Sequence, residues 1–195
     1  MEQDYFHRRN LPHLYSEEGT YFITYRLKDS LPLEFLKQIH QELFSRKDKL
    51  GPKEKKIFKK YDGILDSGCY GNKYLNIPEI AKINQDILHT YDDKEYFLIC
   101  YCIMPNHIHL VFNLLKNNSG ISKIMQLIKG NSAIKSNSIL NKNGTFWQDE
   151  SFDRLVRDEK ELYNIIEYVI NNPVKAGLVE NWQDWKYTYL YKPYQ

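Results

Sequence analysis

The sequence predicts an α+β fold in which helices pack mainly on one face of an antiparallel, ferredoxin-like sheet. The first observation is a pair of apolar runs, 95–104 and 107–114, separated only by a Pro-Asn break, which predicts a tight antiparallel hairpin. The second is an aromatic and β-branched segment at 21–27, which predicts a strand before the hairpin. The third is helical periodicity on both sides of the hairpin, which predicts the order strand–helix–helix–strand–strand–helix–strand–helix.

The composition indicates one globular domain. The chain has 195 residues, 42% hydrophobic and 27% charged, without an internal repeat or interdomain linker. We therefore expect a single domain over 1–195, with 1–19 as an irregular N-terminal arm. The net charge of +2 permits binding to nucleic acid without requiring it. Three cysteines, no apolar leader and no run of about 18 apolar residues predict a cytoplasmic protein with free thiols.

Two helices are predicted between the first strand and the hairpin. A Ser and a Pro precede the first, over 33–47, and Pro78 begins the second, which reaches about His89. The intervening residues 48–76 contain a lysine-rich stretch broken by acidic residues and then a glycine-bearing loop. We expect the lysines to form a solvated face, and we assign 48–76 as an insertion of unknown role.

Two more helices and short extended pieces are predicted after the hairpin. The first helix covers 121–139, and the extended pieces lie within 145–156. Asp158 is the expected N-cap of the last helix. This helix is predicted to continue through Asn172, because Pro173 then ends it.

A pair of histidines lies in the second strand of the hairpin. His107 and His109 are two residues apart, so both imidazoles project from one face of the strand. Ile108, Leu110 and Phe112 point to the other face. Two adjacent imidazoles make a natural pair of metal ligands. The same spacing also fits two histidines on an exposed strand face with no ligand.

The last predicted helix carries an apolar stripe and two polar side chains beside it. The stripe consists of Leu162, Ile165, Ile166, Val169 and Ile170. Tyr168 and Asn172 are four residues apart, so they stack on one flank of the stripe, within reach of a site on the sheet. Tyr163 lies on the opposite flank. This geometry selects one tyrosine from the sixteen in the chain.

These four residues make a coherent chemical set. Two imidazoles and the amide oxygen of Asn172 leave positions open on Mg²⁺ or Mn²⁺ for the oxygens of a phosphodiester. The Tyr168 phenolate then attacks phosphorus, holds the 5′ end covalently and releases a 3′-OH. Ionising a tyrosine at pH 7 costs on the order of 4 kcal/mol without a nearby cation. If neither residue has a catalytic role, Tyr168 is a tyrosine at the edge of the core and Asn172 is a residue that ends a helix.

Several stretches resemble a known family. Residues 104–111 (MPNHIHLV) resemble the His-hydrophobic-His signature of the single-tyrosine HUH transposases, which are insertion-sequence-200-like. Residues 167–179 (EYVINNPVKAGLV) resemble the tyrosine helix and following turn of their REP-associated relatives. Residues 146–148 and 152–153, and the opening around 19–24, are similar to the same pattern. The resemblance spans nearly the whole chain.

The resemblance implies a DNA transposase, a site-specific endonuclease that nicks single-stranded or hairpin DNA and transfers the strand. It implies that His107, His109 and Asn172 bind the divalent ion, Mg²⁺ or Mn²⁺, and that Tyr168 is the nucleophile. It also implies an HUH-like, ferredoxin-like fold. Relatives include homodimers with the tyrosine acting in trans and monomers with it acting in cis, so both states stay open.

The comparison with the family also suggests a role for the arginines of the N-terminal arm. Arg8 and Arg9 are adjacent in an otherwise irregular segment. We expect them to contact DNA phosphates or bases beside the cleavage site.

Three alternatives remain at this level. A non-catalytic module for single-stranded nucleic acid would stack bases on exposed Tyr21, Tyr25 and Tyr101. A phosphodiesterase with water as its nucleophile would need a carboxylate base, for which the candidates are Glu150 and Asp153. A zinc site would combine the two histidines with two cysteines, Cys100 and Cys102, although the usual spacing of structural zinc ligands is missing.

Overall fold

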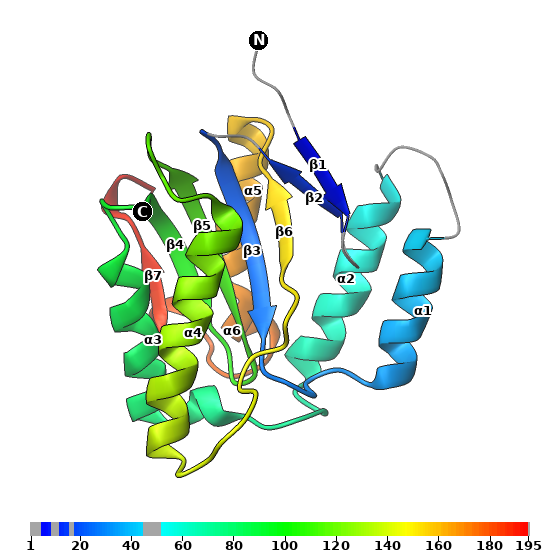
Figure 1. The fold of residues 1–195 in the computed structure, drawn as a ribbon, viewed down its shortest axis with the longest axis vertical. Helices are drawn as coiled ribbons and strands as arrows, with labels where there is room; N and C mark the ends of the chain where they lie inside the picture. Colours follow the sequence, from blue (N-terminus) through cyan, green and yellow to red (C-terminus); the bar gives the residue numbers. More distant parts are fainter. Residues whose placement is uncertain (1–4, 9–11, 16–17, 45–51, 195) are drawn as a thin grey trace.

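The computed structural model describes residues 5–8, 12–15, 18–44 and 52–194, and its main feature is a five-stranded antiparallel sheet (Figure 1). The strands are β3 Thr20–Arg26, β4 Tyr96–Ile103, β5 His107–Leu114, β6 Phe152–Leu155 and β7 Thr188–Leu190. Their order is β6-β3-β5-β4-β7. The first four strands of this order form a ferredoxin-like sheet, and β7 extends it at the β4 edge. The predicted α+β class is confirmed.

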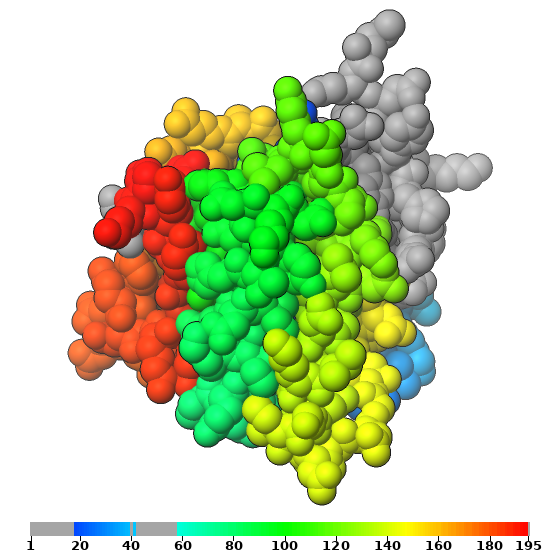
Figure 2. Space-filling model, turned by 60° about the vertical axis from the view of Figure 1, so that its left-hand side comes forward, coloured from blue at the N-terminus to red at the C-terminus, as the bar shows by residue number. Residues whose placement is uncertain are grey.

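The helices cover both faces of this sheet. They are α1 Leu33–Phe44, α2 Pro52–Ser67, α3 Pro78–Thr90, α4 Ile121–Ile139, α5 Glu159–Ile170 and α6 Asn172–Lys175. The helices α3 and α4 lie side by side over one face, and Figure 2 shows them as one continuous layer. The helix α5 packs on the other face, with α2 on the same side (Figure 1). This arrangement differs from our expectation of helices mainly on one face.

The strand β4 has apolar side chains on both faces of the sheet, so both faces need cover, and a β-bulge sets which residues face each side. The register with β5 shifts between Leu98 and Cys100. Leu98 and Tyr101 pack in the core under α3 and α4, whereas Ile99, Cys100 and Cys102 pack in the core under α5. Two consecutive apolar residues therefore face α5, as the extra residue of a bulge allows. The near-continuous apolar run in the sequence corresponds to a strand buried on both sides.

The structure revises three segments. Residues 5–8 and 12–15 form an antiparallel pair, β1 and β2, where we expected an irregular arm. Arg8 ends β1, and Arg9 lies outside the described residues. The predicted helix over 33–47 is present as α1 to Phe44, and its last three positions also lie outside the described part.

The third revision concerns 48–76, where we expected a charged segment and then a glycine-bearing loop. Most of it is the helix α2, followed by a short 3-10 turn at Tyr74–Asn76. In the described part of the chain, no helix has the length and apolar character needed to cross a bilayer.

Candidate active site

The two histidines lie on the face of β5 that is covered by α2 and α5. His107 and His109 are both fully buried, and His109 pairs with Thr24 of the neighbouring strand. Ile108 and Leu110 point the other way, into the core under α3 and α4. The predicted shared face is confirmed, but it is a buried face and not an exposed one.

Each imidazole is oriented through its Nδ1 atom. The Nδ1 of His107 donates to Asn106 Oδ1 at 2.7 Å, and the Nδ1 of His109 lies 2.8 Å from Thr24 Oγ1. Asn172 Nδ2 donates to His109 Nε2 at 2.8 Å, so Nε2 is the acceptor nitrogen and Nδ1 carries the proton. The two Nε2 atoms, each with a lone pair, are then 3.1 Å apart. Two ligands at a right angle on an ion of the size of Mg²⁺ are also about 3 Å apart.

Asn172 reaches this point from the junction of two helices. The helix α5 ends at Ile170, and α6 begins at Asn172 with Pro173 in its first turn, where proline is well tolerated. The predicted single helix through Asn172 is thus broken at Asn171. Asn172 is fully buried, and its Oδ1 has no hydrogen-bond partner. Rotating the amide by a half turn would present this oxygen at the position of Nδ2.

Tyr168 lies beside the histidines, as predicted. Its ring meets that of His109 edge-on, with centroids 5.6 Å apart, and its buried hydroxyl has no hydrogen-bond partner. The ammonium of Lys175 lies 5.3 Å from the centre of the Tyr168 ring. Tyr163 is 48% exposed and packs against Tyr194, away from the site. The flank argument therefore selected the tyrosine that the fold brings to the histidines.

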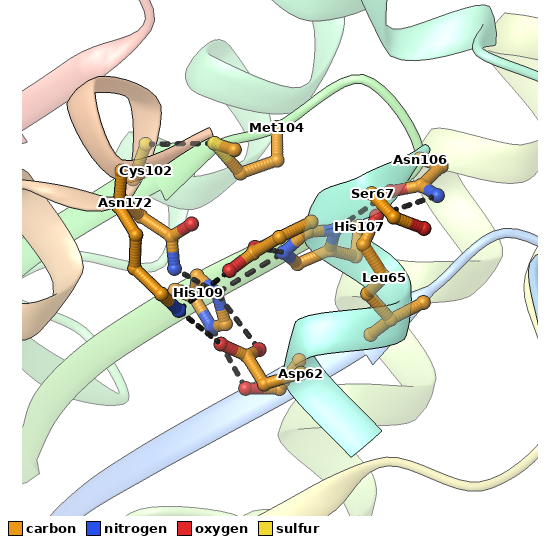
Figure 3. Close-up of polar contacts among 12 residues, drawn as sticks. Asp62, Leu65, Ser67, Cys102, Met104, Asn106, His107, His109 and Asn172 are labelled. Atoms are coloured by element: carbon orange, nitrogen blue, oxygen red, sulfur yellow. Dashed lines mark hydrogen bonds and ion pairs between the residues drawn. The ribbon is translucent and has the colours of Figure 1, made fainter. Parts of the chain in front are cut away.

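Two carboxylates complete the site, and the sequence reasoning missed both. Asp62 Oδ1 lies 3.3 Å from His109 Nε2, and Asp66 Oδ1 lies 3.6 Å from His107 Nε2 (Figure 3). One ligand atom from each of these four residues lies within 4.8 Å of the others. Both aspartates belong to α2, within the segment to which we gave no role. Their spacing of four residues, which places them on one helix face, was the available indication.

Burial shifts the titration of the ionisable groups in this site. The ammonium of Lys175 lies 2.7 Å from Asp66 and 3.8 Å from Asp62. Burial raises the pKa of Asp62 to about 8, with Asp66 acting in the same direction and Lys175 against it. Burial also raises the pKa of Asp66, and it lowers the pKa of His107 to about 3 and that of His109 well below its usual value. The imidazoles are therefore neutral at pH 7, the form in which histidine binds metals.

The donor set fits a divalent cation. Two neutral imidazole nitrogens, the amide oxygen of Asn172 and a carboxylate oxygen are ligands that Mg²⁺ and Mn²⁺ accept. Four acceptors that lack hydrogen bonds lie at this same point: Asn172 Oδ1, both oxygens of Asp62 and Asp66 Oδ1. A cation there would stabilise lone pairs and a charge that burial otherwise disfavours.

The structure contradicts the alternative in which exposed tyrosines of the sheet stack nucleic-acid bases. Tyr21 and Tyr25 are fully buried and Tyr101 is 2% exposed, so none of them offers a ring to a base. All three lie in the core under α3 and α4. Alternation along the strands predicted a common face for them, but only the packing of the helices shows that this face is covered.

The carboxylates proposed for hydrolysis lie elsewhere. Asp153 pairs with Ile23 across β6 and β3, so it shares the face opposite to that of Thr24 and the histidines. Together with Glu150 it lines a separate cavity of about 870 Å³ beside α4. The spacing in the sequence could not place them, because the register of β6 is set by its pairing with β3.

The structure also argues against a zinc site that includes the two cysteines. Cys100 and Cys102 are buried in the core under α5, where burial raises the pKa of Cys102 to about 12 and that of Cys100 well above its usual value. A metal-bound cysteine is a thiolate, which this environment opposes. Within the described residues, the cluster of candidate metal ligands contains no cysteine.

Comparisons with known proteins agree with this geometry. The family model described as "Transposase IS200 like" matches residues 68–172. A REP-associated tyrosine transposase of Haemophilus influenzae is 31% identical over 112 residues, 53% of this chain and 64% of that protein. One of Escherichia coli is 23% identical over 106 residues, 54% of this chain and 61% of that protein. The matched region thus spans less than two thirds of the length of either relative.

A solved structure shares the fold. It is that of a REP-associated tyrosine transposase bound to a REP hairpin, with 16% sequence identity and a TM-score of 0.54. The similarity covers 95% of this chain and 82% of that one. The overall fold is therefore shared. The helix α2 lies outside the residues that the family model matches.

Proposed function

Because this chain belongs to the IS200-like transposase family, we propose that it nicks and rejoins single-stranded or hairpin DNA with Tyr168 as its nucleophile. The observation that carries the proposal is the contact of the Tyr168 ring with His109, with the hydroxyl buried and unpartnered beside two neutral imidazoles. The names of its relatives, and the REP hairpin bound to one of them, support hairpin DNA as the substrate.

The reaction is a pair of transesterifications. The Tyr168 oxygen bonds to the scissile phosphorus as the bond from phosphorus to the 3′ oxygen breaks. The phenol proton leaves, and the released 3′ oxygen takes up a proton to become a 3′-OH. The 5′-phosphotyrosine retains the energy of the phosphodiester. A 3′-OH from another strand then attacks that phosphorus and restores the phenol, which completes strand transfer.

We assign the neighbouring residues to binding and orientation. His107, His109 and Asn172 hold a divalent ion, Mg²⁺ or Mn²⁺, and Asn106 fixes one of the rings through its Nδ1 atom. When bound, this ion supplies a Lewis acid for the phosphodiester oxygens and a positive charge near the phenol. The ammonium of Lys175, beside the Tyr168 ring, adds a second positive charge.

One observation favours a second candidate, hydrolysis by water. The structure places Asp62 and Asp66 at the histidines, and a carboxylate base is what a metal-dependent phosphodiesterase requires. The two reactions differ in their products, because only the tyrosine reaction leaves DNA attached to the protein.

The test compares two tyrosines of the same helix. Labelled single-stranded hairpin DNA is incubated with Mn²⁺ or Mg²⁺ and resolved on denaturing gels, using wild type, Tyr168→Phe and the control Tyr163→Phe. We expect Tyr168→Phe to lower the yield of the covalent adduct by at least about 10³-fold, because it removes the nucleophile. Tyr163→Phe should match wild type, since Tyr163 lies away from the site.

Each other outcome has a distinct meaning. An adduct that persists in Tyr168→Phe would refute the assignment of the nucleophile. Metal-dependent cutting without any adduct would favour hydrolysis. Binding of the hairpins without cutting would leave a nucleic-acid-binding module.

A further inference from the structure

The helix α2 buries an unpartnered carboxylate in the site. Asp62 is 1% exposed, and neither of its oxygens accepts a hydrogen bond of ordinary geometry. Burial raises its pKa, and the nearby side chain of Asn172 offsets only part of this rise. Its neighbours include the neutral ring of His109 at 3.3 Å and Lys175 Nζ at 3.8 Å. A buried carboxylate without close partners is costly, and such groups commonly pair with a cation or bind a metal.

Asp62 is held in this position by contacts on both sides of it in the sequence. Arg26 Nε donates to the hydroxyl of Tyr61 at 3.0 Å, and Asn106 Nδ2 donates to the carbonyl of Leu65 at 3.2 Å. Asn106 also orients His107 through its Oδ1 atom. The same side chain therefore positions one imidazole and the helix that carries the carboxylate.

A contact on the previous turn of α2 strengthens this attachment. The ring of Phe58 packs edge-on against those of Phe22 and Tyr168, with centroids 5.4 and 5.9 Å away. The helix thus contacts the sheet, one histidine's orienting residue and the tyrosine helix.

The second aspartate is in a different situation. Asp66 Oδ2 accepts a hydrogen bond from Lys175 at 2.7 Å, so this carboxylate already has a cation partner, although its Oδ1 lacks a hydrogen bond. Asp62 lies one helical turn away, with its nearest cation more than 1 Å farther off than this. The two aspartates therefore form a matched pair for an experiment. They lie in the same region, but only Asp66 has a cation within hydrogen-bond distance.

We propose that Asp62 is a further ligand of the divalent ion, together with His107, His109 and Asn172. This inference rests on the proposed function, because it concerns the same ion. It assigns a role to α2, which lies outside the residues matched by the family model. Bound there, the ion would tie α2 to the histidines and would still have positions open for phosphodiester oxygens.

Mn²⁺ binding to the full chain without DNA tests the proposal by calorimetry. The variants are Asp62→Asn, the matched control Asp66→Asn, and His109→Ala. We expect Asp62→Asn to weaken Mn²⁺ binding by at least about 10-fold, and Asp66→Asn by less than about 3-fold. Circular dichroism checks folding, and we expect Asp62→Asn to fold, since it has the same shape and removes a buried charge.

Hydrogen exchange gives a second readout that does not depend on activity. Mn²⁺ should slow exchange of the amides over 58–67 in the wild type and leave them unchanged in Asp62→Asn. An Mn²⁺ affinity of Asp62→Asn within twofold of wild type, an equal loss in Asp66→Asn, or no change in exchange in the wild type would overturn the proposal. If wild type binds no Mn²⁺, or His109→Ala binds it normally, the metal site of the proposed function itself fails.

Discussion

At the scale of single residues, the chemistry of the site depends on what each imidazole nitrogen contacts. His107 is oriented by Asn106, its neighbour in the chain, whereas His109 is oriented by Thr24, which is 85 residues away. Both contacts use Nδ1 and leave Nε2 directed toward the centre of the site. The His-x-His spacing predicts that the rings share a face, but the nitrogen that each ring presents depends on neighbours that only the sheet register supplies.

Lys129 illustrates how burial changes the titration of one residue. Its ammonium donates to the carbonyl oxygens of Gln148 at 2.6 Å and Asp149 at 2.7 Å, and burial lowers its pKa to about 8. In the unfolded chain a lysine titrates near 10.4, so the unfolded state binds more protons between these values and stability rises with pH across that window. Compared with Lys129→Met, the wild type should gain about 1 kcal/mol between pH 7.5 and 9.5, allowing for solvent screening.

Urea unfolding at both pH values measures this difference. The Met variant is the reference because it keeps the long apolar stem and lacks the charge. A stability difference that stays constant or falls as the pH rises would contradict the prediction.

At the scale of elements, the two ends of α5 differ in how well they were predicted: the start was predicted correctly and the end was not. Asp158 caps its start by accepting from the amide of Glu161 at 2.8 Å, as predicted. Its buried stripe faces the sheet as the apolar periodicity indicates. At the other end, the break at Asn171 starts a separate helix. Asn172 still reaches His109, but through the start of α6 and not through the helical stacking that we assumed.

The cap of α5 allows a test of how local stability supports the site. Asp158→Ala should lower the free energy of unfolding by about 0.5–2 kcal/mol, because it leaves the first-turn amides without an acceptor. The control Asp158→Ser keeps an oxygen at the cap and should recover most of the loss. Thermal and urea unfolding measure both variants. Equal stability of Asp158→Ala and wild type would mean that packing alone holds this end of the helix.

At the scale of the whole molecule, the site is covered. The side chains of His107, His109 and Asn172 are fully buried, and Asp62 is 1% exposed, so in this arrangement a phosphodiester has no direct access to them. The helix α2 supplies part of this cover, and its described side chains hold it there through polar contacts, aromatic contacts of Phe58 and Tyr61, and the ion pair of Asp66 with Lys175. Under the proposed function, a phosphodiester would reach these side chains only after part of this cover has moved, and a movement of α2 would separate Asp62 from the histidines.

The N-terminal arm is the other feature at this scale, because its two strands form a separate small sheet that contacts the edge of the main one. The strand β2 lies beside β6 (Figure 1), so Arg8, at the end of β1, belongs to a paired segment at that edge. We propose that Arg8 and Arg9 contact DNA. Substituting both with alanine should weaken binding to hairpin DNA about 10-fold. The slope of log affinity against log salt concentration should fall by the amount expected for the loss of about two phosphate contacts.

The control for this prediction removes an equal positive charge from another part of the surface. Lys82→Ala with Lys123→Ala removes two positive charges from α3 and α4, on the other face of the sheet. Fluorescence anisotropy at several salt concentrations measures both double variants. Unchanged affinity of the arginine variant, or an equal loss in the lysine variant, would remove the assignment.

The sequence alone determined the features that follow from local periodicity and short motifs. The bounds of β5 and α4, the shared face of the histidines and the cap at Asp158 all depend on residues within a few positions of one another. The choice of Tyr168 among sixteen tyrosines also came from spacing along one helix. The bounds, the shared face and the cap are confirmed because backbone geometry sets the direction of neighbouring side chains. The catalytic role of Tyr168 stays a prediction.

Only the tertiary structure decided which distant segments meet. It buried Tyr21 and Tyr25 under α3 and α4, and it placed Asp153 on the face opposite the histidines. It also brought Asp62, from a segment whose sequence suggested only a solvated surface, to within 3.3 Å of His109. Such contacts depend on sheet register and helix packing over tens of residues, which periodicity within one segment does not encode.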